Sequence, residues 1–269
     1  MPITPVLLVM LVMAVALRLR WGPALRARDA WHRVRPVVRD HIMGSPGTYL
    51  YLFAVTITAW VLATSTNHVD NVLLRTHSSN LSGLEDNPLR ALVQSAFWVE
   101  GVPSYLVALG LGIALAPVER RIGTFRWTWV FALGHMGATL IVAAAIWVGL
   151  RTGDVPLGVR HMVDVGSSYG FAAVAGCMTH LLPPRTGRRY SAAVALVLAA
   201  LVVALRDFPS LGHLVAFGIG VALVPLAVPR RVDAEPMTLD VRPSARALMA
   251  RLRGTARASG AVSRDPSRW

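Results

Sequence analysis

Apolar residues gather into long runs that are separated by short polar stretches rich in arginine. Six runs approach the 20 or so largely apolar residues with which a helix crosses the hydrocarbon core of a bilayer. They cover residues 48–64, 94–116, 127–150, 165–183, 190–205 and 210–228. Residues 1–17 form a further apolar run, which lacks the positive start of a secretory signal. The pattern predicts an all-α polytopic membrane protein with a six-helix core and an extra N-terminal hydrophobic helix.

Composition agrees with this assignment, because 54% of the residues are hydrophobic, more than a soluble domain of this length carries. Cys177 is the only cysteine, so an intramolecular disulfide and a multi-cysteine metal site are excluded. The chain also lacks a phosphate-binding glycine loop and a zinc-binding motif. We therefore expect neither a metal nor a cofactor.

Arginine supplies every basic side chain, and its distribution predicts the orientation of the helices. Of 27 arginines, twenty-two lie on one side of the predicted topology and five on the other. The positive-inside rule places both ends of the core in the cytoplasm of a cell-membrane protein. The predicted segments are 1–17, a basic cytoplasmic or interfacial stretch at 18–47, the core at 48–228 and a basic, partly disordered cytoplasmic tail at 229–269. A net charge of +13 alone would allow nucleic-acid binding, but arginines dispersed between apolar segments indicate the lipid bilayer and no nucleic acid as partner.

Two polar residues within the apolar runs are predicted to lie at the same depth. The runs 165–183 and 210–228 both enter the membrane from outside, and Ser168 and His213 follow Asp164 and Asp207 by four and six residues. Both therefore lie roughly 6–9 Å below the outer boundary. A neutral imidazole can take the proton of a serine hydroxyl, so Ser168 and His213 form a candidate catalytic dyad. The start of the same helix offers candidate oxyanion or site-lining residues, namely Gly166, Ser167 and Tyr169.

Small residues at every fourth position would let these two helices approach closely. After Ser168 they are Ala172 and Gly176, and on the later helix they are Gly212, Ala216 and Gly220.

Structural roles are open for several of the same side chains. Serines near a helix start also satisfy unpaired backbone donors, and Ser167 suits packing better than chemistry. His135 is expected to be a satisfied interior polar group, Asp164 a loop residue that could cap the helix, and Cys177 a core residue.

Four stretches resemble rhomboid intramembrane serine proteases, in the family's order and over about residues 48–228. "VGSSYGFAAVAG" is similar to the family's G-x-S-G stretch, with Ser168 as its serine, and "GHLVAFGIG" to its histidine helix, with His213. "NPLRALVQSAF" keeps Arg90 of a Trp-Arg stretch. "PVERRIGTFR" is similar to the Glu-Arg-Arg-x-Gly turn, through Glu119, Arg120, Arg121 and Gly123.

The resemblance implies a peptidase that cleaves membrane-anchored protein substrates, with Ser168 as nucleophile and His213 as general base and acid. Tyr169 occupies a position at which the family has glycine. Ala173 and Ala216 likewise replace family glycines further along the chain. The stretch "VPSYLVALG" lacks the His and Asn with which the family supports the oxyanion; Ser104 is its small polar residue. The alternative is a catalytically inactive rhomboid-like protein that binds transmembrane clients.

Overall fold

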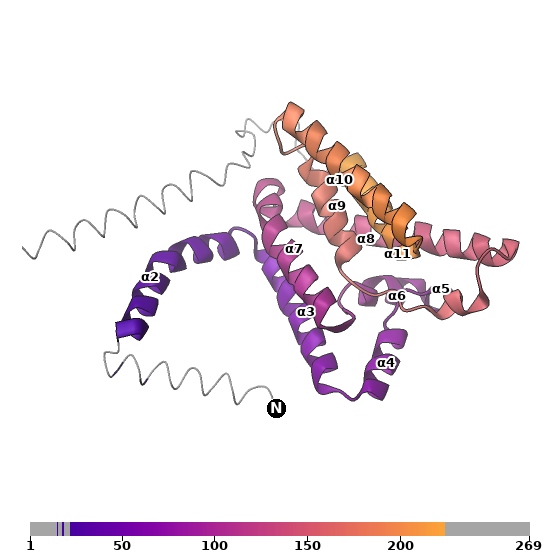
Figure 1. Cartoon of the computed structure of the whole chain (residues 1–269), viewed down its shortest axis with the longest axis horizontal. Helices are drawn as coiled ribbons and strands as arrows, with labels where there is room; N and C mark the ends of the chain where they lie inside the picture. Colours follow the sequence, from indigo (N-terminus) through magenta and orange to yellow (C-terminus); the bar gives the residue numbers. More distant parts are fainter. Residues whose placement is uncertain (1–14, 16–17, 19–21, 224–269) are drawn as a thin grey trace, which may run out of the picture. The chain divides into compact units, whose positions relative to one another are not determined.

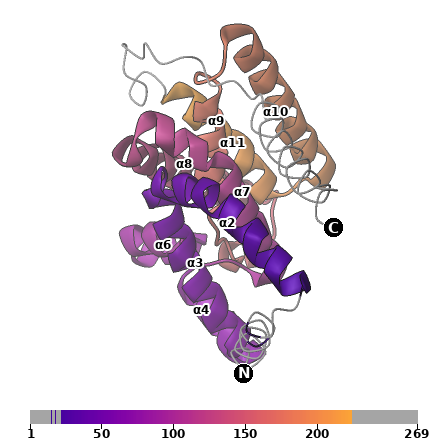
Figure 2. The ribbon, with the colours of Figure 1, turned by 90° about the vertical axis from the view of Figure 1, so that its left-hand side faces the viewer.

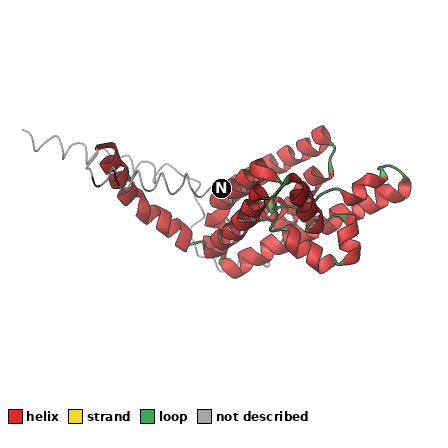
Figure 3. Cartoon of the chain, turned by 90° about the horizontal axis from the view of Figure 1, so that it is seen from below, coloured by secondary structure: helices red, strands yellow, loops and turns green. Residues whose placement is uncertain are grey.

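The computed structural model describes residues 22–223 together with Val15 and Arg18. This part of the chain is helical and contains no strand, as Figure 3 shows. The predicted tail at 229–269, and the predicted N-terminal helix at 1–17 apart from Val15, lie outside the described residues. The prediction of an all-α polytopic membrane protein is confirmed for the described core.

Six helices in Figure 1 correspond to the six predicted runs. Four are long and apolar enough to cross a membrane: α3 (Pro46–Thr64), α7 (Gly101–Ile122), α8 (Thr124–Thr152) and α10 (Pro184–Leu205). Two are shorter: α9 (Ser168–Met178) and α11 (Phe208–Ala222). The bounds differ most at α7, which begins at Gly101 rather than at 94 and continues through Pro117 to Ile122. We call the end of this bundle that holds Asp164 and Asp207 the outer end, after the orientation predicted from the arginines.

The segment at 65–90, which separates the first two predicted apolar runs, contains short helices. They are α4 (Asn67–Thr76), α5 (Leu81–Asp86) and the start of α6 (Pro88–Ser95). The Asn80 and Asn87 side chains accept hydrogen bonds from the backbone N–H groups of Gly83 and Arg90, which caps α5 and α6. These helices are too short to produce the long apolar runs by which the core helices were predicted.

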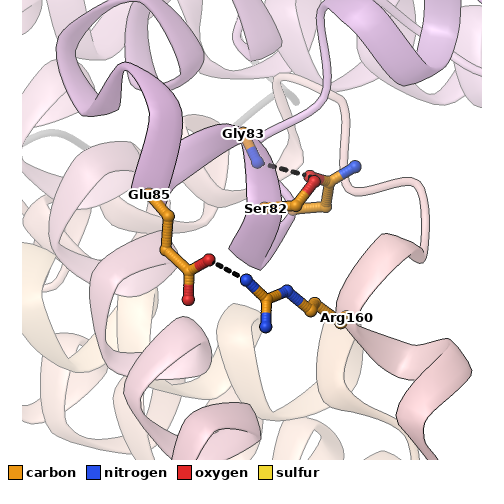
Figure 4. Close-up of polar contacts among 5 residues, drawn as sticks. Ser82, Gly83, Glu85 and Arg160 are labelled. Carbon is orange, nitrogen blue, oxygen red and sulfur yellow. Dashed lines mark hydrogen bonds and ion pairs between the residues drawn. The ribbon is translucent and has the colours of Figure 1, made fainter.

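A salt bridge joins this segment to the chain that precedes α9. Arg160, in the 3₁₀ helix η1 (Leu157–His161), pairs with Glu85 of α5. Figure 4 shows this contact beside the capped start of α5.

The carbonyl groups that follow α6 are satisfied by side chains of α3. The Tyr51 hydroxyl donates to the Ala96 carbonyl, and the Thr58 hydroxyl donates to the Phe97 carbonyl. Irregular backbone is tolerated at membrane depth only where protein groups satisfy it. These two bonds therefore fix the end of α6 against α3.

A buried carboxylate fixes the inner end of α3. Glu119, 1% exposed in α7, accepts hydrogen bonds from the backbone N–H groups of Gly47 and Thr48 and from the hydroxyls of Thr48 and Thr124. It thus caps α3 from another helix, while Ser45, at the N-cap itself, donates to the Ala116 carbonyl. The adjacent Arg120 donates to the Asp40 carbonyl of α2 (Gly22–Met43).

Helix α9 lies among α7, α8 and α11 (Figures 1 and 2). Helix α10 packs mainly against α11, and its span has no residue buried inside the described structure apart from Gly187. A Cβ atom on Gly187 would lie 2.2 Å from the Thr179 carbonyl oxygen, and the Tyr190 hydroxyl donates to the Ala175 carbonyl. Both contacts hold the inner end of α10.

Candidate functional site at the outer end of α9

Helix α9 begins below the outer end of the bundle because the chain before it is irregular. At about 1.5 Å per residue, its 11 residues cover roughly 16 Å, about half of the hydrocarbon core. The preceding backbone is held by protein partners: Gly166 N–H donates to the Ser95 carbonyl, and Asp164 N–H to the Ser78 hydroxyl. Gly166 has φ +134°, a conformation that favours glycine. This arrangement presents the first turn of α9 inside the protein.

The two adjacent serines face different surroundings. Ser167 is 1% exposed and lies beside the Tyr51 hydroxyl, so its position agrees with packing. Ser168 is the first residue of α9 and is partly buried. Within residues 22–223, no hydrogen bond joins Ser168 to His213, although both lie near the outer ends of their helices.

Tyr169 is the aromatic neighbour of His213. The two rings meet edge to face, with centroids 5.1 Å apart and an interplanar angle of 77°. The Tyr169 side chain is buried, packs against Ala138 and Ala216, and interacts through its hydroxyl with Asp164. Tyr169 thus contacts α8 and α11 from the first turn of α9.

Gly212 provides the space that the Tyr169 ring occupies. A Cβ atom on Gly212 would lie 2.3 Å from Tyr169 Cζ, so any larger residue there would displace the ring. His213 itself is partly buried and lies next to the Pro209 carbonyl and the Asp207 carboxylate. Asp207 also caps α11 by accepting from Ser210 N–H at 2.8 Å.

One predicted oxyanion donor is already used. The Gly166 N–H group donates to the Ser95 carbonyl at 2.9 Å. Ser104 in α7, the small polar residue of "VPSYLVALG", is exposed rather than directed into the bundle. The described part of the chain has no group of three or more His, Cys, Asp or Glu residues that could hold a metal ion.

Small residues bring α9 and α11 into backbone contact. A Cβ atom on Gly176 would lie 2.2 Å from the Phe217 carbonyl oxygen, and one on Gly220 would lie 1.9 Å from the Ala173 carbonyl oxygen. Ala216 is fully buried, and Ala172 packs partly buried against the cluster of Tyr169, Ala138 and Ala216. The residue of α9 that faces Gly220 is therefore Ala173.

Sequence reasoning missed a polar cluster that joins the segment before α5 to the segment before α9. The Ser79 hydroxyl donates to the carbonyl and the carboxylate of Asp164, the Ser78 hydroxyl accepts from Asp164 N–H, and Ser79 N–H donates to the Asp164 carbonyl. Asp164 therefore does not cap α9, whose N-cap is Ser167. The run "HSSN" was the available signal, because consecutive small polar residues next to apolar ones favour local side-chain to backbone bonds.

The Asp164 carboxyl makes the stability of this outer cluster depend on pH. Burial raises its pKa from 3.8 to about 6, although hydrogen bonds from Ser79 and Tyr169 oppose the rise. Because the folded-state pKa is the higher one, the folded chain retains a proton that the unfolded chain loses between these values. The protonated Asp164 carboxyl stabilises the folded chain at pH values below its ordinary pKa of 3.8, and about 3 kcal/mol of this stabilisation is lost as the pH rises from there to about 6.

We expect Asp164→Asn to reduce this loss, since an amide does not ionise. The thermal unfolding midpoint in detergent micelles, measured near pH 4.5 and near pH 7.5, should fall less for Asp164→Asn than for the unsubstituted chain. Asp154→Asn is the matched control, because Asp154 is exposed in the loop after α8. An equal fall in all three proteins would show that Asp164 is not the titrating group.

Comparison with known proteins identifies the family. No curated protein and no solved structure matches the chain. A family model described as "Rhomboid-like protein" matches residues 40–233, which is most of the chain and includes all six core helices. The chain therefore belongs to the rhomboid-like protein family.

Proposed function

We propose that this rhomboid-like membrane protein binds transmembrane helices of other membrane proteins without cleaving them. The observation that carries the proposal is the position of Tyr169, whose ring packs edge to face on His213. A general base must come within hydrogen-bond reach of the proton that it removes, at about 2.6–3.2 Å between heavy atoms. The neighbour of the His213 imidazole is the Tyr169 ring. To act as a general base, His213 would need the Ser168 hydroxyl in that position instead.

The surroundings of the first turn of α9 support the same proposal. An oxyanion needs several preorganised donors, and the Gly166 N–H group is engaged by the Ser95 carbonyl. Ser104 is exposed on α7 and offers no replacement for the absent His and Asn. A developing negative charge next to Ser168 would therefore have weak support from side chains.

The second candidate function is an intramembrane serine peptidase. It is favoured by the partial exposure of Ser168, whose side-chain hydroxyl has no hydrogen-bond partner within residues 22–223. In this reaction Ser168 Oγ would attack a carbonyl of a membrane-anchored substrate. His213 would take the hydroxyl proton and pass it to the leaving amine. Tyr169 would first have to move away from His213.

The distribution of the arginines supports a proposal for the location and orientation of the protein. Most lie at the inner end of the bundle or beyond it, so we propose a cell-membrane protein with both ends of the core in the cytoplasm. The candidate site at Ser168 and Tyr169 would then lie in the outer leaflet.

A serine-reactive probe separates the two candidates. Full-length protein in detergent is incubated with a fluorescent fluorophosphonate, next to Ser168→Ala, His213→Ala and the matched control Ser167→Ala. We expect the unsubstituted chain to be labelled no more than Ser168→Ala, because His213 does not activate the serine. A known serine hydrolase in the same micelles verifies that the probe is reactive.

Labelling that is lost in Ser168→Ala and His213→Ala but kept in Ser167→Ala would overturn the non-catalytic proposal in favour of the peptidase. Tyr169→Gly adds a further measurement. If labelling through Ser168 arises only in this variant, the tyrosine ring is the cause of the inactivity.

A further inference from the structure

A groove between α3, α6 and α8 has features of a binding site. It has a volume of about 620 Å³ and is lined by α3, by α6 and the residues after it, and by α8. Its walls are apolar, with Leu50, Phe53 and Ile57 from α3, Val93 from α6 and Met136 from α8. An apolar wall alone would be explained by contact with lipid. Two polar groups in this groove require another explanation.

Both polar groups are on α8 and are buried without a hydrogen-bond partner in the described structure. They are the Trp127 indole nitrogen Nε1 and the His135 ring nitrogen Nδ1. Each residue is 3% exposed and contributes to the groove lining, while the two nitrogen atoms themselves have almost no accessible surface. Buried polar groups in folded proteins are almost always paired, so two unpaired groups along one groove indicate that a partner supplies their bonds.

The hydrogen bonds already present define what each group needs. The Ser95 hydroxyl donates to the Leu92 carbonyl at 3.4 Å and lies 3.2 Å from His135 Nε2. In the tautomer that carries its proton on Nε2, His135 donates to Ser95, and His135 Nδ1 is then an acceptor. Trp127 Nε1–H is a donor. The partner therefore presents a donor to His135 and an acceptor to Trp127.

The spacing of the two groups excludes an acyl chain as a sufficient partner. Trp127 is in the first turn of α8, and His135 is eight residues later, roughly 12 Å further into the membrane. A phospholipid could offer an ester carbonyl at the level of Trp127, but its hydrocarbon chain has no donor for His135. A transmembrane helix with a Ser, Thr, Asn or Gln side chain midway along it has one.

We propose that the groove between α3, α6 and α8 is the docking site for a client transmembrane helix that carries a hydroxyl or amide side chain midway along its span. This inference rests on the proposed function and specifies its site and its partner. The His135 Nδ1 atom selects the polar client residue. The Trp127 indole N–H donates a second hydrogen bond to the client, nearer the client's cytoplasmic end, and apolar client side chains fill the rest of the groove.

The test uses two designed single-span peptides, labelled with a fluorophore, that differ only in one central residue. One has Asn and the other Leu in an otherwise identical leucine- and alanine-rich helix, which in both peptides also has a Gln about eight residues nearer the cytoplasmic end as the acceptor for Trp127. Binding is measured by energy transfer to the full-length, labelled protein in vesicles of phosphatidylcholine and phosphatidylglycerol. We expect the Asn peptide to bind about 3- to 15-fold more tightly than the Leu peptide, the range given by hydrogen bonds between membrane helices.

Variants assign this preference to the groove. His135→Leu should abolish it, and Trp127→Phe, which keeps an aromatic ring and removes only the N–H donor, should weaken both peptides. Trp129→Phe is the matched control, since Trp129 is 51% exposed on α8 and does not line the groove. Ala132→Phe, which fills the groove without removing a polar group, should weaken both peptides and keeps the test valid if His135→Leu does not fold.

The outcomes separate the groove from the proposed function. If both peptides bind equally and neither Ala132→Phe nor Trp127→Phe alters their binding, the proposal that the groove is the docking site is overturned. The proposal that the protein binds client helices would still hold, with the binding site elsewhere. If neither peptide binds, the proposed client-binding function fails together with the groove. If Ala132→Phe weakens both peptides but the Asn peptide binds no more tightly than the Leu peptide, the groove takes apolar occupants without selecting a polar residue and the inference is overturned.

Discussion

Replacement of Glu119 by Gln is expected to destabilise the protein by about 2–4 kcal/mol. Both carboxylate oxygens accept from one backbone N–H and one hydroxyl, at 2.7 to 2.8 Å. An amide has one oxygen, so in either orientation its NH₂ group faces a backbone N–H of Gly47 or Thr48. The hydroxyls can rotate to accept, but a backbone N–H cannot. The change also removes negative charge from the N-terminus of α3, where it is favourable.

The measurement is the free energy of unfolding in detergent micelles, by denaturant or by heat. Glu100→Gln is the matched control, because Glu100 is exposed at the N-cap of α7 and accepts no side-chain capping bond. We expect the control to change the stability by less than about 0.5 kcal/mol. Comparable losses in the two variants would mean that the buried hydrogen bonds of Glu119 contribute little.

Gly220→Ala is expected to cost about 3 kcal/mol, and it should separate α9 from α11. The added Cβ would meet three backbone atoms of Ala173, the closest of them the carbonyl oxygen at 1.9 Å. Backbone atoms in the middle of a helix cannot move aside as a side chain can. Relief requires the whole of α11 to shift, which also disturbs the contact between Gly176 and Phe217.

Gly218 provides a control on the same helix. A Cβ atom there meets nothing within 4 Å, so Gly218→Ala should be neutral or stabilising by up to about 1 kcal/mol through helix propensity. The two alanine variants are compared by thermal unfolding in the same detergent. If Gly220→Ala is as stable as Gly218→Ala, the close approach of α9 and α11 does not contribute to stability.

Hydropathy predicted the order of the six core helices because long apolar runs are a direct requirement of the membrane. It could not predict α4, α5 and the start of α6, since short helices that pack on protein need few apolar residues and their ends depend on single capping side chains such as Asn80. The prediction starts α7 too early, at 94, because Ala96 and Val99 are apolar for another reason: they are buried against protein in the segment between α6 and α7.

The candidate site illustrates a different limit. Depth along two parallel helices could be estimated from residue counts, so Ser168 and His213 were expected at one level. Rotation about each helix axis is set by tertiary packing. A difference of about 100° per residue decides whether Ser168 or its neighbour Tyr169 contacts α11. Helix rotation also decides which residue of α9 faces Gly220, and that residue is Ala173 rather than the predicted Ala172. The catalytic role of Ser168 and His213 stays a prediction that the probe experiment tests.

The sparse packing of α10 has a consequence for the bilayer in which the protein resides. Its inner end is held by Gly187 and by the bond from Tyr190, whereas its outer end is exposed at Val203 and Leu205. A change in tilt about the inner end would alter the thickness of hydrocarbon that α10 spans at the expense of its contacts with α11, and it would leave the packing of α8 against α9 intact. Helix α10 is thus the element that can absorb hydrophobic mismatch in membranes of different thickness, at a small cost per ångström.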